Sequence, residues 1–106
     1  MTTQIVKDPT AKQIQVASQF LKLASDPTRL KILWALLHGE HSVNDLAEHV
    51  GAKAAAVSQH LAKLRKAKLV TATRDGNKLY YEMSNRHMRK AIEKALEYAA
   101  DTKSAS

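Results

Sequence analysis

The pattern of apolar and polar positions along the chain predicts five helices and one β-hairpin. Apolar residues that recur three or four positions apart predict amphipathic helices over residues 10–24, 28–38, 42–51, 53–67 and 85–101. Two β-prone runs, residues 69–74 and 77–83, are joined through Asp75-Gly76, where glycine readily takes the positive φ of a tight turn. The pattern therefore predicts a mostly α fold with about five helices and two strands in a small hairpin.

The segment 28–38 is the most hydrophobic of the predicted helices. Asp26 can cap its start, and Pro27 suits its first position, which needs no amide donor, while Gly39 ends it. One stripe of this helix is apolar: Leu30, Leu33, Trp34 and Leu37. We expect this stripe to form the centre of the core.

A short helix, a tight turn at Gly51 and a second short helix form the helix-turn-helix pattern. Three apolar residues of the second helix are expected to face inward: Val57, Leu61 and Leu64. The opposite face and its flanks carry small and polar residues: Ala55, Ser58, Gln59, Ala62, Lys63 and Lys66. The major groove of DNA accepts a helix only if its outer side chains are small or hydrogen-bonding. This face is therefore typical of a helix that reads double-stranded DNA.

The chain of 106 residues is expected to form one domain over residues 10–101, with flexible ends at residues 1–9 and 102–106. It contains no cysteine, which excludes disulfides, thiolate metal sites and cysteine nucleophiles. No apolar run reaches the roughly 18 to 20 residues of a membrane span, and the N-terminus lacks the apolar stretch of a signal peptide. These observations predict a cytoplasmic protein with no membrane partner.

Basic charge is concentrated in one part of the chain. The sequence has 17 Lys and Arg against 10 Asp and Glu, a formal net charge of +7. In residues 51–80, seven cations stand against Asp75 alone, a net of +6. The seven are Lys53, Lys63, Arg65, Lys66, Lys68, Arg74 and Lys78. Evenly spread charge would indicate only a solvated surface, whereas this concentration favours a polyanionic partner, and the adjoining helix-turn-helix favours DNA over an acidic membrane.

Several segments together resemble the ArsR/SmtB family of bacterial winged-helix repressors. They are DPTRLKIL, NDLAEHVG, VSQHLAKLRKAKLV and RDGNKLYYEM, and the resemblance covers about residues 14–101. It implies a winged helix-turn-helix fold and a homodimer that binds a two-fold operator until an effector weakens binding. A regulator of this kind would lie at the bacterial nucleoid.

The resemblance and the outer-face pattern together select the residues expected to bind DNA. They are Lys53, Ala55, Ser58, Gln59, His60, Lys63, Lys66, Arg74, Asn77 and Lys78. His60 lies near the inner stripe and is interpreted as a seam residue that gives one hydrogen bond to backbone or phosphate. The chain departs from the family at Lys53-Ala54-Ala55, where Ser-Gln-Ser is frequent, and at Lys68, where glycine is common. The first departure removes a helix cap and one base contact.

The resemblance also implies that the first and last helices form the dimer interface. In a lone chain their apolar stripes would remain exposed as a sizeable patch. The residues expected in this interface are Phe20, Leu21, Met88, Ile92 and Leu96.

The metal sites of the family are largely missing from this sequence. The two cysteines of one site correspond to Ser42 and Asn44, which are not soft ligands. A second site, between subunits, corresponds to Asn85, His87, Tyr98 and Asp101, of which only His87 and Asp101 are convincing ligands. We therefore expect no cofactor. The effector is a small molecule or, with less support, a divalent transition metal, held elsewhere if at all, for example by the histidines near residue 40.

Three other functions compete with a sequence-specific repressor. An enzyme has little support, because the chain has no glycine-rich phosphate loop and no recognisable catalytic constellation. An architectural protein that coats DNA without sequence preference would need only the basic charge. A protein-interaction module built on the last helix would have no DNA affinity. A metal-sensing repressor with an atypical site remains a variant of the main interpretation.

Overall fold

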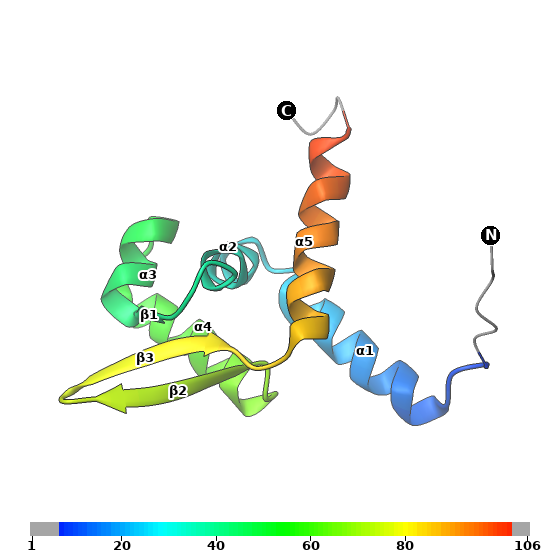
Figure 1. Ribbon diagram of the computed structural model, residues 1–106, viewed down its shortest axis with the longest axis horizontal. Helices are drawn as coiled ribbons and strands as arrows, with labels where there is room; N and C mark the ends of the chain where they lie inside the picture. Colours follow the sequence, from blue (N-terminus) through cyan, green and yellow to red (C-terminus); the bar gives the residue numbers. More distant parts are fainter. Residues whose placement is uncertain (1–6, 103–106) are drawn as a thin grey trace.

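The structure is a computed structural model that describes residues 7–102 (Figure 1). Within these residues the helices are α1 (Ala11–Ala24), α2 (Pro27–Leu36), α3 (Val43–Val50), α4 (Ala54–Lys66) and α5 (Arg86–Ala100). The strands are β1 (His41–Ser42), β2 (Val70–Asp75) and β3 (Lys78–Met83). All five predicted helices are confirmed, close to their predicted bounds. The predicted flexible ends fall largely on residues 1–6 and 103–106, which lie outside the described residues.

Side-chain caps define where the first two helices begin. Thr10 and Gln13 form a capping box, in which each side chain accepts a hydrogen bond of 3.0 Å from the other residue's backbone N–H. Asp26 Oδ2 accepts the backbone N–H of Arg29 at 3.0 Å, and Pro27 follows as predicted. This hydrogen bond holds the pKa of Asp26 below its ordinary value, and the positive charge of Arg29 acts in the same direction.

The sheet has three antiparallel strands in the order β1-β3-β2, and not the two strands predicted. Asp75 pairs with Lys78, so the hairpin turns through Gly76 and Asn77, and Gly76 takes a φ of +67°. The extra strand β1 pairs its two residues with Tyr81 and Tyr80 of β3. So short a strand has no alternating pattern of its own, and only its position beside β3 makes it a strand.

The core gathers residues from α2, α3, α4, the sheet and α5. Its fully buried large side chains are Ile32, Leu33, Leu36, Leu46, Val57, Leu61, Leu64 and Val70. The predicted central stripe of α2 is wrong in part, because Trp34 is 47% exposed while Ile32, Ala35 and Leu36 are buried with Leu33. This helix is apolar on nearly every side, so its pattern could not indicate which side faces inward.

The helix α1 projects away from the rest of the molecule, and α5 runs vertically in this view, beside α2 (Figure 1). Ile92 of α5 is only 2% exposed and belongs to the core of a single chain, so the expectation that it lies on an open interface patch is wrong. Arg89 ties α5 to the end of α2 by donating from Nη1 to the Leu37 carbonyl at 3.1 Å. The described helices are too short and too polar to cross a membrane.

Candidate nucleic-acid interface

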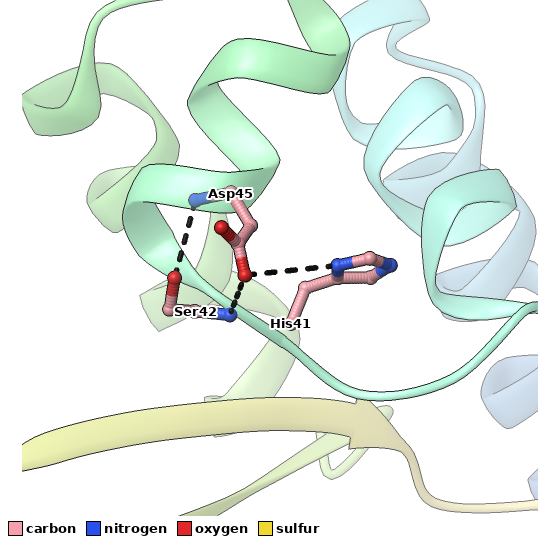
Figure 2. A network of polar contacts seen from close by, with 3 residues as sticks. All are labelled: His41, Ser42 and Asp45. Carbon is pink, nitrogen blue, oxygen red and sulfur yellow. Dashed lines mark hydrogen bonds and ion pairs between the residues drawn. The ribbon is translucent and has the colours of Figure 1, made fainter.

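The helix α3 starts at a fixed point because Ser42 and Asp45 form a capping box (Figure 2). Ser42 Oγ accepts the Asp45 backbone N–H at 3.2 Å, and Asp45 Oδ2 accepts that of Ser42 at 3.5 Å. His41 Nδ1 lies 4.0 Å from the same carboxylate oxygen. The cap and the pairing of β1 with β3 together anchor the start of α3 to the hairpin.

A left-handed glycine makes the turn between α3 and α4. Gly51 has φ +68° and ψ +38°, and its N–H donates to the Ala47 carbonyl at 3.0 Å. Lys53 follows as the N-cap of α4, and its side chain makes no capping hydrogen bond, as the departure at this position predicted. The first backbone N–H groups of α4 therefore have no side-chain cap.

The predicted outer face of α4 is exposed, and its predicted inner face is buried. Ala55, Ser58, Gln59, Lys63 and Lys66 are all exposed. Val57, Leu61 and Leu64 are buried against the core. Small and hydrogen-bonding side chains thus lie toward the start of the exposed face, and cations lie toward its end.

The hairpin presents its basic tip to solvent, with Arg74, Asn77 and Lys78 all exposed. Between α4 and β3 lies a groove of about 320 Å³, which the sequence did not predict. Its lining includes Ser58, Arg65 and Lys66 of α4 and Tyr81 of β3. The sequence indicates only the charge of Arg65, because a position beside the inner stripe does not show that the hairpin packs next to it.

All seven cations of residues 51–80 are exposed. Lys68 is the one described non-glycine residue with a positive φ, +65°, at the junction of α4 and β2. A left-handed backbone with a side chain costs roughly 1–2 kcal/mol, and glycine would avoid this cost. The unusual lysine therefore adds charge to this junction at the expense of backbone strain.

His60 is partly buried and contacts Arg29 of α2. Arg29 Nη1 lies 3.3 Å from His60 Nδ1, and Arg29 Nε donates to the Leu23 carbonyl at 2.8 Å. Since arginine can only donate, His60 Nδ1 is the acceptor in this contact. His60 therefore links α4 to α2, and the expected hydrogen bond to phosphate could use only its other ring nitrogen.

The candidate metal ligands do not come together within the described chain. His87 lies in the first turn of α5 and Asp101 caps its end, roughly 21 Å away at 1.5 Å per residue. His38 stacks edge-on against Trp34, whereas His41 packs edge-on against His49 at 5.1 Å between ring centroids. Of the histidines near residue 40, His38 and His41 thus each pack against a different ring. Within residues 7–102 no group of three or more His, Cys, Asp and Glu is placed to hold a metal ion.

Comparisons with known proteins agree with this arrangement. Residues 26–72 match the family model for the bacterial regulatory protein, arsR family. The HTH-type transcriptional regulator KmtR of Mycobacterium tuberculosis is 45% identical over 80 residues, which cover 76% of this chain and 62% of KmtR. The crystal structure of the AntR antimony-specific transcriptional repressor is 30% identical with a TM-score of 0.79, covering 92% of this chain and 94% of AntR. The chain belongs to the arsR family.

The family match extends from the N-cap of α2 into β2 and so includes both α3 and α4. A second solved structure is that of the homodimeric winged helix-turn-helix DNA-binding domain Mb0332 from Mycobacterium bovis. It is 26% identical, with a TM-score of 0.79, and the alignment covers 95% of this chain and 92% of that domain. The fold of this arsR-family chain is therefore a winged helix-turn-helix, in which the wing is the β2–β3 hairpin.

Proposed function

We propose that the protein is a homodimeric repressor that binds a two-fold operator through α4 and the wing and is released by an effector. One observation carries this proposal: the exposed face of α4 is small and polar at its start, and exposed cations surround it. A helix of this kind fits the major groove, while the cations neutralise flanking phosphates.

The proposed DNA surface makes two kinds of contact, one with base edges and one with phosphates. Ser58 and Gln59 carry hydroxyl and amide groups that can read base edges, so we assign sequence discrimination to them. Lys53, Lys63, Lys66, Arg74 and Lys78 carry charge and mainly supply affinity. Ala55 allows α4 to approach the DNA closely, and Asn77 contacts the DNA backbone at the tip of the wing. Arg65, which lines the groove between α4 and β3, adds a further phosphate contact.

A homodimer supplies the two copies of α4 that a two-fold operator needs. The domain Mb0332, which has the same fold, is described as homodimeric. In this chain α1 and α5 carry exposed apolar side chains, among them Leu21 and Tyr98. Phe20, Met88 and Leu96 are partly buried against the core and extend the same surface.

The effector of this regulator is a small molecule bound in the dimer interface or, with less support, a divalent transition metal. AntR is named for antimony, which makes a metal or metalloid effector the natural first test. His87 and Asp101 of one chain are too far apart to share an ion, so a metal site that uses these residues needs ligands from both subunits. The chain matches 62% of the length of KmtR.

Binding to the protein's own promoter, compared with random DNA at physiological salt, tests the proposal. A preference of 100-fold or more is expected for a sequence-specific repressor. Equal affinity for both DNAs would establish the architectural alternative, and no affinity for either would leave only a protein-interaction role. Titration of zinc, nickel and cobalt into the dimer, with and without His87→Ala, then tests whether a metal releases the operator.

A further inference from the structure

The chain between α4 and β2 closes in a Schellman motif. The Lys68 N–H donates to the Arg65 carbonyl, and the Leu69 N–H donates to the Leu64 carbonyl, both at 2.9 Å. Leu64 and Leu69 are buried, which supplies the apolar contact that accompanies this motif. The residue after the C-cap Ala67 must be left-handed, and Lys68 holds this place with a φ of +65°. Glycine normally fills it, because a side chain strains a left-handed backbone.

The fold itself does not need a lysine at this place. The Lys68 side chain is exposed, and the ion pairs within residues 7–102 join His41 to Asp45 and Lys94 to Glu97. Glycine would form the same motif without strain. A strained residue that the surrounding structure does not require points to a function.

A polar groove lies beside Lys68, along the edge strand β2 of the sheet, and is named here the wing-root groove. It has a volume of about 440 Å³ and is lined by Arg65, Lys68, Val70, Thr71, Ala72 and Ser84. Four of these six residues carry a cation or a hydroxyl group, and none of the six carries a carboxylate. Cations and hydroxyl groups are the side-chain groups that bind DNA phosphates.

The charges around the wing-root groove favour an anion. Residues 65–72 and 82–86, which line and flank it, contain four cations against one carboxylate, a net of +3. The carboxylate, Glu82, pairs with Thr71 in the sheet and is exposed. Arg65 and Lys68 line the same groove and repel each other, so an anion bound between them would replace repulsion by attraction. The four cations are Arg65, Lys66, Lys68 and Arg86.

Lys68 also borders a hollow of about 330 Å³ toward α1 and α5. Most of that lining is apolar, and its other polar members include Asn85 and His87. An ammonium group is costly to place among apolar side chains. The wing-root groove is therefore the more favourable place for the charge of Lys68.

The wing-root groove continues the proposed DNA surface. Arg65 lines both this groove and the groove between α4 and β3, which is also lined by Ser58. Polar side chains therefore run from Ser58, past Arg65, to Lys68. Lys66 lies eight residues after Ser58, roughly 12 Å along α4, and Lys68 lies beyond it. Ser58 and Lys68 are thus too far apart to contact the same phosphate.

We propose that the wing-root groove binds a phosphodiester of the DNA strand that passes between α4 and the wing, beyond the phosphates beside the bases that α4 reads. Arg65 and Lys68 supply the positive charge, and the hydroxyl groups of Thr71 and Ser84 donate hydrogen bonds. This inference rests on the proposed function and adds a contact to it. The strain at Lys68 is then a loss of stability that is offset by affinity for DNA.

Substitution of Lys68 separates strain from charge. Lys68→Gly should raise the urea midpoint, yet it should weaken binding to promoter and random DNA alike and lower the slope of log affinity against log salt by about 1. Lys68→Gln keeps the strained backbone without the charge, so it should lower the slope equally and leave the urea midpoint close to that of the wild type. Lys68→Arg should keep the wild-type slope.

Promoter duplexes that carry a single neutral methylphosphonate then locate the phosphate. The wild type should lose affinity at each contacted position along the strand. In Lys68→Gly one of these positions should become insensitive, and the others should not change. Lys90→Ala, which removes an exposed cation of α5, is the matched control and should keep the wild-type slope and every sensitive position.

Three results would contradict the proposals, and they differ from one another. A wild-type slope and pattern in both Lys68→Gly and Lys68→Gln would overturn the wing-root contact while leaving the repressor intact. Saturable binding of inorganic phosphate or pyrophosphate to the free protein, lost in Lys68→Gln while DNA binding is unchanged, would overturn it by making the groove a site for a free anion. A wild type without affinity for any DNA would instead remove the proposed function.

Discussion

The surface formed by α3, α4 and the wing differs from the surface formed by α1, α2 and α5. On the first, the exposed side chains are small, polar or cationic, and its apolar residues are buried. On the second, large apolar side chains remain exposed in a single chain. In the proposed function, the first surface binds a solvated polyanion and is complete in one subunit, whereas the second binds an identical subunit and is left uncovered until that partner binds.

The strongest test of this contrast compares two apolar residues on the second surface. Ile92→Glu would bury a carboxylate in the core, so we expect a loss of more than about 4 kcal/mol in the free energy of unfolding. Leu21→Glu changes a side chain that is 63% exposed, so we expect a folded monomer. Circular dichroism and sedimentation separate the two outcomes. A folded, monomeric Ile92→Glu variant would contradict the placement of Ile92 in the core.

A smaller effect is expected on the face of α4 that we propose reads bases. Gln59→Ala should weaken binding to the cognate operator by about 1–3 kcal/mol and relax one position of the sequence, with little change on random DNA. Gln15→Ala, an exposed glutamine of α1, is the matched control and should change neither. Equal losses on cognate and random DNA would show that Gln59 does not discriminate sequence.

The cations should act on all DNA sequences alike. Lys78→Ala and Arg65→Ala should each weaken cognate and random binding similarly and reduce the slope of log affinity against log salt by about 1. Lys90→Ala, an exposed cation on α5, serves as the control. If Arg65→Ala leaves the slope unchanged, the groove between α4 and β3 holds no phosphate.

Lys68 tests whether the basic junction of α4 and β2 is maintained against its own backbone strain. Lys68→Gly should increase the free energy of unfolding by about 1 kcal/mol, because glycine adopts a φ of +65° without a side-chain clash. Urea denaturation at constant protein concentration measures the change. Lower stability in the variant would mean that contacts of the lysine outweigh the strain.

The smallest effect concerns the acid range. The pKa of Asp26 is lowered in the folded chain, so the stability from its cap is present above its ordinary pKa of 3.8 and is lost as pH falls through the lower folded value. Asp26→Asn keeps an acceptor oxygen without a titrating charge. The stability difference between the wild type and this variant should therefore shrink on acidification below about pH 3.8, and Asp75→Asn provides the control.

Local signals in the sequence determined the helices, the hairpin and the exposed face of α4. The cap at Ser42, the glycine at position 51 and the inward spacing of Val57, Leu61 and Leu64 act over a few residues, so each can be recognised without the rest of the fold. The predicted DNA-binding residues of α4 and the wing are exposed for the same reason, apart from the partly buried His60.

Contacts between distant segments decided what the local signals left open. The short strand β1 exists because β3 lies beside it, and Arg65 borders a groove only because the hairpin packs next to α4. Trp34, expected in the core, is half-exposed, and Ile92, expected on an open interface patch, is buried. The apolar stripe of a helix shows that some side is covered but not which neighbour covers it. Burial depends on how whole helices pack together, and that packing is a property of the tertiary structure alone.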